Sequence, residues 1–270
     1  MYLDFFGLDE EAFTMTPNPK FIYWTRQHES AAEALTYGIT GRKGFLMLTG
    51  EVGTGKTTIC REVMNRTPAK TEIAVVLNPL QSTEGLLKAI MTDFGHSIGS
   101  LGSSEEMITA FNHFLLKKTA DGHNAVLWID EAQNLSFEAL EMIRLLSNLE
   151  TDDKKLLQIV LVGQPELEVL LDEYRLRQLN QRISIRQRLS ALNFDELSQY
   201  IQHRLFIAGN RQNIHFEHRA LKHIYKYTQG SPRLTNVLCD RVLLAAYSNR
   251  TRQINHKLIK EAYRDLGWRS

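Results

Sequence analysis

The strongest chemical signal in this chain lies at residues 50–58, which read Gly-Glu-Val-Gly-Thr-Gly-Lys-Thr-Thr. The segment matches the spacing G-x-x-x-x-G-K-[ST], with Gly50, Gly55, Lys56 and Thr57 at the fixed positions. Glycines allow backbone turns that a Cβ would forbid, so the amides of such a loop can surround a phosphate. We expect the nucleotide to be bound by Gly50, Glu51, Val52, Gly53, Thr54, Gly55, Lys56, Thr57 and Thr58.

The segments on either side of the loop support this interpretation. Residues 45–49 form a short apolar run typical of a buried strand, and Lys56 opens a segment with helical periodicity. A helix N-terminus after a glycine loop directs N–H groups and the positive end of the helix dipole at phosphates. Lys56 would then reach the β- and γ-phosphates, and the Thr57 hydroxyl would bind Mg²⁺. The alternative is a chance glycine-rich turn.

A second chemical signal is the acidic pair Asp130-Glu131, which follows the apolar segment 125–129. A carboxylate at a strand end, downstream of such a loop, is typical of a ligand for the Mg²⁺ of a bound nucleotide. We assign that role to Asp130. The next residue, Glu131, would point to the opposite face and act as the base that polarises a water for attack on the γ-phosphate. The alternative is a solvated acidic pair that opens the helix expected over 136–149.

Strands and helices that could position these residues alternate along the first 190 residues. The predicted strands cover 45–49, 72–77, 125–129, 157–162 and 183–189. This alternation predicts an α/β fold, a parallel sheet with helices on both faces. From about residue 191 only helices are expected, over 193–207, 218–227, 232–248 and 256–266. We therefore predict two domains, 1–190 with an N-terminal lead-in and 191–270 as a small helical domain.

Composition and the lack of targeting segments argue against a secreted or a membrane-spanning protein. The 270 residues are 43% hydrophobic and 23% charged, as in ordinary globular proteins. The sequence shows no signal peptide and no apolar run long enough to span a bilayer. Its two cysteines, Cys60 and Cys239, lack metal-ligand spacing, and we expect them to be buried apolar residues in a reducing compartment. We expect a cytoplasmic chain without a transmembrane segment.

Charge is distributed unevenly along the chain. Residues 1–171 carry 14 Lys and Arg against 23 Asp and Glu, whereas residues 172–270 carry 18 against 8. Such a molecule could stack head to tail on copies of itself, or offer its basic half to nucleic acid or acidic lipid. Solvated surface charge without a partner is the third interpretation.

The loop, the acidic strand end and the helical C-terminal part together resemble an AAA+ ATPase of the P-loop (ASCE) class. This resemblance implies ATP or ADP and Mg²⁺ as ligands, and a helical lid after the sheet domain. It places Gln164, after the predicted strand 157–162, at the sensor-1 position, and Arg233 of Gly-Ser-Pro-Arg at the sensor-2 position, in contact with the nucleotide. It also implies an arginine finger that enters the site of a neighbouring subunit. Arg182 matches that position best and Arg177 is second.

Further motifs resemble the general secretion pathway protein A (ExeA/GspA) family across nearly the whole chain. They are Phe13…Pro17-Asn18-Pro19…Phe21, residues 145–151 (LLSNLET), residues 161–167 (LVGQPEL), residues 200–205 (YIQHRL) and residues 230–233 (GSPR). Members of the secretion type often continue into a membrane span and a peptidoglycan-binding domain. Both a piece of a longer protein and a short standalone member therefore stay open.

The resemblance implies an ATPase that drives assembly of a type II secretion complex or an MSHA-like type IV pilus. It implies a self-associated ring or head-to-tail oligomer, and secretion or pilus-assembly partners at the cytoplasmic face of the inner membrane. Related ATPases of transposition share the core, so the rival interpretation is a DNA-binding ATPase that regulates transposition. A scaffold that binds nucleotide without fast hydrolysis is a third, weaker interpretation.

Overall fold

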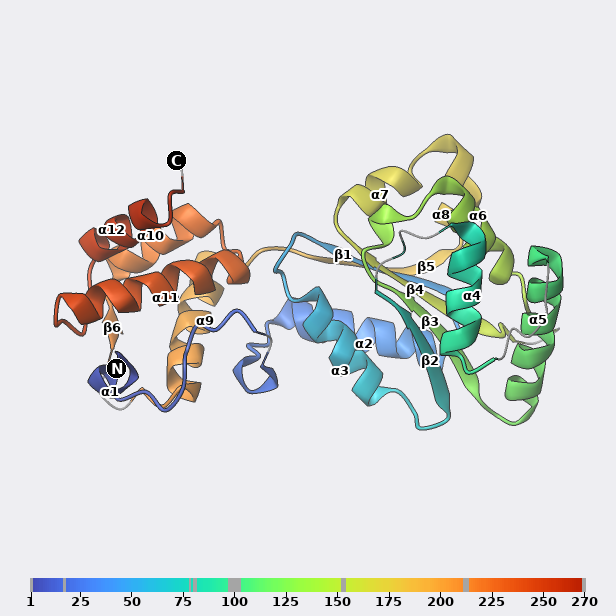
Figure 1. Ribbon diagram of the computed structural model, residues 1–270, viewed down its shortest axis with the longest axis horizontal. Coiled ribbons are helices and arrows are strands. Elements are labelled where there is room, and N and C mark those ends of the chain that lie inside the picture. The colour runs from blue at the N-terminus through green and yellow to red at the C-terminus, as the bar shows by residue number, and fades with distance from the viewer. Residues whose placement is uncertain are drawn as a thin grey trace. The chain divides into compact units, whose positions relative to one another are not determined.

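The computed structural model describes residues 2–16, 18–77, 79, 82–96, 103–151, 154–210 and 214–268. The chain divides into two compact units, each assembled from separate segments (Figure 1). The sheet unit combines Gln27–Glu51 with Ile59–Leu189. The helical unit combines Met1–Arg26, Val52–Thr58 and Ser190–Ser270. Pro17, part of the N-terminal motif, lies outside the described residues.

Five parallel strands in the order β2-β3-β4-β1-β5 form the centre of the sheet unit. Each strand begins and ends within one residue of its predicted range. The short apolar runs form buried strands because helices cover both faces of the sheet. The strands are β1 (Phe45–Gly50), β2 (Thr71–Val76), β3 (Asn124–Ile129), β4 (Leu157–Gly163) and β5 (Ile183–Leu189).

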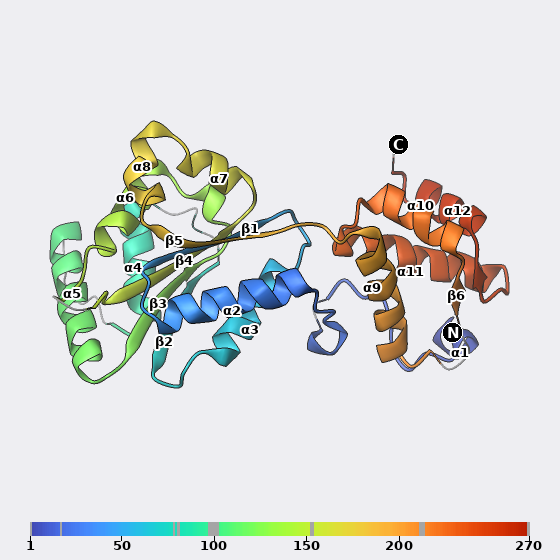
Figure 2. The same ribbon diagram turned by 180° about the vertical axis from the view of Figure 1, so that it is seen from behind.

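Helices lie on both faces of this sheet, as Figures 1 and 2 show from opposite sides. One face carries α2 (Arg26–Thr40) and the part of α3 (Lys56–Arg66) that belongs to the sheet unit. Helix α2 approaches the sheet closely at Gly38, where an added Cβ would lie 2.5 Å from Leu46 Cδ2. The other face carries α4 (Thr83–Asp93), α5 (Ser104–Ala120) and α6 (Phe137–Leu146).

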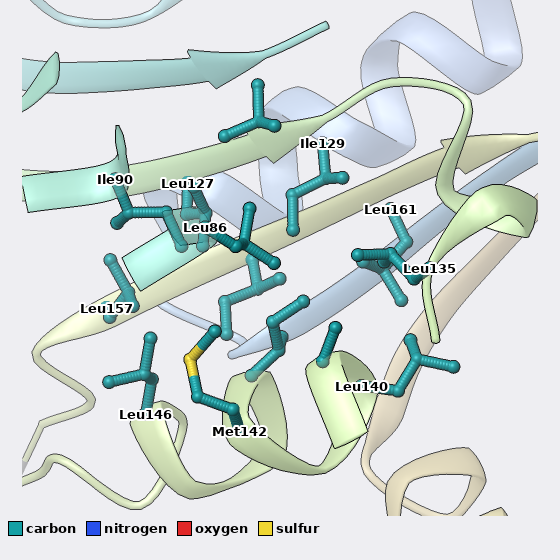
Figure 3. Packing of buried hydrophobic residues seen from close by; sticks show 14 of the residues in the cluster. Leu86, Ile90, Leu127, Ile129, Leu135, Leu140, Met142, Leu146, Leu157 and Leu161 are labelled. Carbon is teal, nitrogen blue, oxygen red and sulfur yellow. The ribbon is translucent and has the colours of Figure 1, made fainter. Parts of the chain in front are cut away.

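A continuous hydrophobic core fills the space between the sheet and this second layer of helices (Figure 3). Figure 3 shows Leu86 of α4, Leu127 of β3 and Leu146 of α6 in this cluster, and all three are fully buried. Burying one such side chain contributes about 1.5–3 kcal/mol. The predicted fold class, a parallel sheet between helices followed by a helical part, is confirmed.

The helical unit is built from four longer helices together with the N-terminal residues. They are α9 (Phe194–Ile207), α10 (His218–Thr228), α11 (Pro232–Ser248) and α12 (His256–Asp265). The N-terminal residues include α1 (Tyr2–Phe6) and the short 3₁₀ helix η1 (Pro19–Phe21), and the two-residue strands β6 (His215–Phe216) and β7 (Gln253–Ile254) pair in parallel. Phe6, Phe13 and Phe21 are buried in the same core as the C-terminal helices. The lead-in thus shares the core of this unit, and the division at residue 190 stays a prediction.

A buried arginine explains much of the signature at residues 200–205. Arg204 is 7% exposed, and its Nε donates a hydrogen bond to the carbonyl of Ala12 over 2.5 Å. Its Nη1 donates to the Tyr200 hydroxyl, which donates to Asn236 Oδ1 over 2.6 Å. The guanidinium also lies 4.8 Å from the centre of the Phe21 ring. The signature therefore fastens the N-terminal segment to α9 and α11.

The Gly-Ser-Pro-Arg motif forms the junction that opens α11. Gly230 has a φ of +76°, and a Cβ added there would overlap the carbonyl oxygen of Leu192. Its own carbonyl accepts a hydrogen bond from Leu192 N–H over 3.0 Å. Ser231 caps the helix and Pro232 occupies its first turn, where a missing N–H costs nothing. The motif thus fixes the start of α11 against the start of the C-terminal segment.

Replacing Gly230 by Ala should destabilise the protein by at least about 2 kcal/mol, because the change adds backbone strain and a steric overlap. Urea unfolding followed by circular dichroism measures the loss. Gly267→Ala is the matched control: Gly267 also has a positive φ, +66°, but apart from its chain neighbours no atom of the described residues lies within 4 Å of an added Cβ. Equal losses in the two variants would show that the contact with Leu192 is unimportant.

Candidate functional site

The carboxyl ends of three neighbouring strands bring the predicted residues of the sheet unit to one edge. Strand β4 lies between β1 and β3 and pairs in parallel with both, with Thr49 opposite Gly163 and Ile129 opposite Leu161. Gly50 ends β1, Asp130 follows β3 and Gln164 follows β4. Because parallel strands end at the same edge, the glycine loop begins beside the residues expected to act on the nucleotide.

The loop itself has the backbone that phosphate binding requires. Gly53 and Gly55 have φ values of +83° and +97°, a region that side chains with a Cβ rarely enter. Helix α3 begins directly after them, at Lys56, so its first amides are unpaired within the helix. Lys56 is 8% exposed, whereas the Thr57 side chain on the first turn is exposed. The segment therefore offers N–H groups, one cation and one hydroxyl to a ligand.

Hydrogen bonds fix the backbone of the acidic pair Asp130-Glu131. Asp130 N–H donates to the carbonyl of Val76 over 2.8 Å, which continues the pairing of β3 with β2. Glu131 N–H donates to Asp130 Oδ1 over 2.9 Å. Glu131 itself adopts φ 50° and ψ 38°, a left-handed conformation that costs about 1–2 kcal/mol for a residue with a Cβ. Such strain is typical of functional positions that the surrounding structure holds in place.

Two glutamine amides hold the carboxylate of Glu131. Gln133 Nε2 donates to Glu131 Oε2 over 2.5 Å, and Gln164 Nε2 donates to the same oxygen over 3.3 Å. Gln133 Oε1 in turn accepts a hydrogen bond from the backbone N–H of Gln164 over 3.1 Å. The predicted base and the predicted sensor-1 residue are therefore in direct contact, and Gln133 connects them a second time.

Gln133 belongs to none of the motifs recognised in the sequence. The signal that could have indicated Gln133 is Gly163, the glycine directly before Gln164, because a glycine at a strand end can mark the close approach of another side chain. A Cβ added at Gly163 would lie 2.8 Å from Gln133 Oε1 and 3.0 Å from Leu167 Cδ2. The glycine of the motif at residues 161–167 thus makes room for the Gln133 side chain.

Replacing Gln133 by Glu should lower kcat for ATP hydrolysis by about tenfold, since a hydrogen bond to a charged group contributes about 1.5–3 kcal/mol. The change keeps the acceptor for Gln164 N–H, removes the donor to Glu131 and adds a like charge. KM for ATP should stay within twofold, on the order of experimental error. Asn134→Asp, the same chemical change at the exposed next residue, is the control in a steady-state phosphate-release assay. A similar loss in that variant would argue for a general charge effect.

A second polar contact joins α7 (Glu166–Leu171), which follows Gln164, to the strand that leads into the loop. The buried Thr49 hydroxyl donates a hydrogen bond to Glu168 Oε1. Glu168 Oε2 lies 3.7 Å from Arg188 Nη1 on β5. The helix after the predicted sensor is thus fastened to β1 one residue before Gly50.

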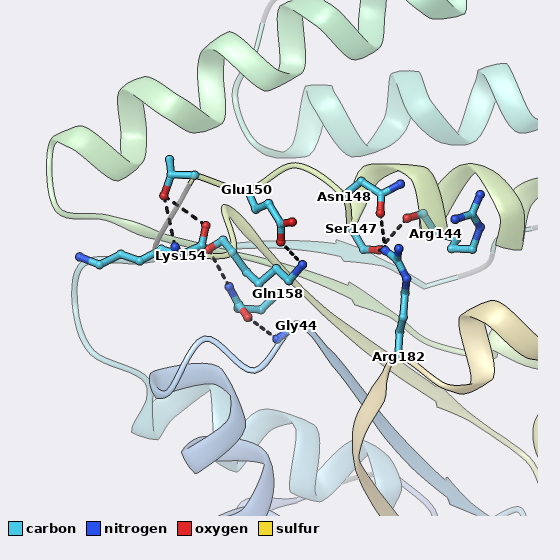
Figure 4. A network of polar contacts seen from close by, with 10 residues as sticks. Gly44, Arg144, Ser147, Asn148, Glu150, Lys154, Gln158 and Arg182 are labelled. Carbon is cyan, nitrogen blue, oxygen red and sulfur yellow. Dashed lines mark hydrogen bonds and ion pairs between the residues drawn. The ribbon is translucent and has the colours of Figure 1, made fainter.

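The predicted arginine finger is bonded within its own chain. Arg182 stands just before β5, and its Nη1 donates to Ser147 Oγ over 2.9 Å and to Asn148 Oδ1 at the end of α6 (Figure 4). The second candidate, Arg177, lies over the Tyr174 ring at 4.4 Å from its centre. The finger role of either residue stays a prediction.

The predicted sensor-2 residue belongs to the helical unit, together with loop residues Val52–Thr58. Arg233 is the second residue of α11 and is exposed. A Cβ added at Gly53 would lie 2.6 Å from Arg233 Cβ. Arg233 therefore lies directly against the loop, at its second glycine.

A family model described as an AAA domain matches residues 39–171. This range begins at the end of α2 and ends with α7, so it contains the loop, Asp130, Glu131 and Gln164. Among solved structures, the ORC2 protein of Aeropyrum pernix has a TM-score of 0.66 at 19% identity and covers 95% of this chain and 71% of its own. Cdc6p of Pyrobaculum aerophilum has a TM-score of 0.70 at 16% identity, with 96% and 71% covered. At these identities the likeness shows the fold.

The family match, the fold and the loop define the chain as an AAA+ ATPase. Within that class, general secretion pathway protein A of Aeromonas hydrophila is 43% identical over 256 residues. The predicted resemblance to the general secretion pathway protein A family is therefore confirmed. The aligned region is 95% of this chain and 47% of that protein, so the chain spans about half the length of this relative. Among the described residues, no helix combines the length and apolar character needed to cross a membrane.

Proposed function

We propose that this chain hydrolyses ATP in a Mg²⁺-dependent reaction to drive oligomer-dependent assembly of a type II secretion complex or an MSHA-like type IV pilus. The observation that carries the hydrolysis is the Glu131 carboxylate, held by two amides at the sheet edge where the glycine loop begins. A fixed carboxylate that follows a strand end can accept a proton from an attacking water. The proposed cellular process is supported by the similarity to general secretion pathway protein A.

Each predicted residue has a separate task in this proposal. Lys56 and the loop amides bind the phosphates of ATP, and Glu131 accepts the proton of the attacking water. Gln164, which donates a hydrogen bond to the base, would orient the attacking water. Arg233, which lies against Gly53, contacts the γ-phosphate.

Thr57 and Asp130 are the residues that would hold Mg²⁺. A hydroxyl and a carboxylate are hard oxygen donors, and Mg²⁺ typically takes one or two protein oxygens with substrate phosphates and waters. No group of three or more potential His, Cys, Asp or Glu ligands occurs within the described part of the chain. The donor set thus suits a cation shared with a nucleotide. When bound, the cation neutralises charge on the phosphates.

Arg182 is proposed to act from a neighbouring copy, so turnover per subunit should rise with protein concentration. Arg182→Ala should flatten this dependence and leave ATP affinity nearly unchanged. A finger contributes about 10³–10⁵ in rate in related enzymes, and a slow ATPase would show less. The control is Arg186→Ala, because Arg186 is exposed and bonds to Asn180 of its own chain. An unchanged concentration dependence in Arg182→Ala would contradict the finger role of Arg182 and leave Arg177 as the candidate to test.

The process is tested by complementation in the bacterium that encodes this chain. A strain that lacks the gene should lose protein secretion or pilus assembly, and the wild-type gene should restore it. A Glu131→Gln gene should fail to restore it although the protein is made.

The rival function, a DNA-binding ATPase of transposition, is favoured by the excess of positive charge in residues 172–270. Normal secretion and pili together with altered transposition would select that rival.

A further inference from the structure

A basic face extends over two neighbouring helices of the helical unit, α10 and α12, which lie side by side (Figures 1 and 2). On α10, three exposed cations recur at helical spacing and so share one side of the helix. On α12, two more follow the same spacing. We call this surface the α10–α12 face and define it by Arg219, Lys222, Lys226, Lys260 and Arg264.

Half-buried rings join the two helices between these cations. His223 of α10 lies 5.6 Å from His256 of α12, and Tyr227 stacks on Tyr263 at 3.9 Å, each measured between ring centres. Tyr263 also contacts Trp268 edge to face. The cations therefore stand on one continuous surface with an aromatic seam.

Cations outnumber acidic residues on these two helices, since α10 carries no Asp or Glu and α12 carries Glu261 and Asp265. Within the part of the chain that the structure describes, none of the five cations of the α10–α12 face forms an ion pair. Burial lowers the pKa of His256, and the charges of Arg219, His223 and Lys260 lower it further, against a smaller opposite effect of Glu217. Cations from both helices thus converge on His256. An excess of this kind is typical of a surface that binds a polyanion.

We propose that the α10–α12 face binds the anionic headgroups of a phospholipid membrane. Each Lys or Arg near an acidic leaflet contributes about fivefold in affinity, equivalent to about 1 kcal/mol. Two helices side by side offer several cations at once to a planar array of charges. Tyrosine and tryptophan are enriched at membrane interfaces, and the aromatic seam contains both residue types. Tyr227 and Tyr263 each use one ring face on the other, which leaves them poorly suited to stack on nucleic-acid bases.

This inference goes beyond the proposed function, because contact with headgroups needs neither ATP nor hydrolysis. Co-sedimentation of the nucleotide-free chain with phosphatidylcholine vesicles, with and without phosphatidylglycerol, tests it. Binding should require phosphatidylglycerol and weaken steeply with salt. The double variant Lys222→Glu/Lys226→Glu should lower binding by at least about tenfold, since it removes and reverses two charges on the face.

The matched control reverses two exposed lysines of the sheet unit, Lys70→Glu/Lys117→Glu, and changes net charge by the same amount. It should retain vesicle binding, and circular dichroism should show both variants folded. An equal loss in the control would overturn the assignment to the α10–α12 face. Failure of the unmodified chain to bind phosphatidylglycerol vesicles, with salt-sensitive binding to duplex DNA that the Lys222→Glu/Lys226→Glu variant loses, would assign the face to nucleic acid instead. ATP turnover, measured without vesicles, tests the proposed hydrolysis separately.

Discussion

Replacing Glu131 by Gln should leave binding of ATP and Mg²⁺ intact while slowing turnover by about 10² or more, the usual effect of removing a general base. The amide keeps the shape of the side chain but cannot accept the proton of the attacking water. The contacts from Gln133 and Gln164 can still form with the amide oxygen, so the local structure should survive. Phosphate release at saturating ATP measures the loss, and calorimetry with a non-hydrolysable analogue checks binding.

The matched control for this variant is Glu166→Gln, the same change at an exposed residue two positions after Gln164. It should hydrolyse ATP at the wild-type rate. Near-normal turnover in Glu131→Gln would assign the base to another residue. Asp130→Asn separates the neighbouring role, since it should chiefly raise the Mg²⁺ concentration needed for half-maximal turnover.

Replacing Lys56 by Ala should weaken ATP binding by at least about tenfold, because a charge-assisted hydrogen bond contributes about 1.5–3 kcal/mol. Turnover should be lost with it, since the same cation faces the β- and γ-phosphates during the reaction. Titration calorimetry with ATP measures the affinity. Lys70→Ala, which removes an exposed lysine of the same unit, should bind ATP normally. Unchanged affinity in a folded Lys56→Ala protein would refute the assignment of the loop.

The sequence predicted the sheet well because its strands carry a strong local signal. The runs 45–49, 125–129 and 157–162 are short and mostly apolar and are followed by glycine or an acidic residue, as expected for buried parallel strands. The glycine loop was predictable because its function depends on local backbone conformation, and Gly53 and Gly55 have the positive φ values that such a loop needs.

What the sequence could not show are contacts between residues distant along the chain. The hydrogen bond from Gln164 to Glu131, and the one from Gln164 N–H to Gln133, depend on the parallel alignment of β3 with β4, which no local pattern encodes. The lead-in gives no sign that Phe6 and Phe13 are buried among C-terminal helices. No local pattern shows that Arg182, assigned from the resemblance, bonds to Ser147 and Asn148, which lie 35 and 34 positions earlier in the chain.

The central claim is that this chain hydrolyses ATP with Glu131 as the base. Steady-state phosphate release by the purified chain and its Glu131→Gln variant, with Mg²⁺ and with a chelator, tests it most directly. We predict turnover by the unmodified chain that requires Mg²⁺ and falls by about 10² or more in the variant. Equal release by the two proteins, or release that persists in the chelator, would contradict the claim.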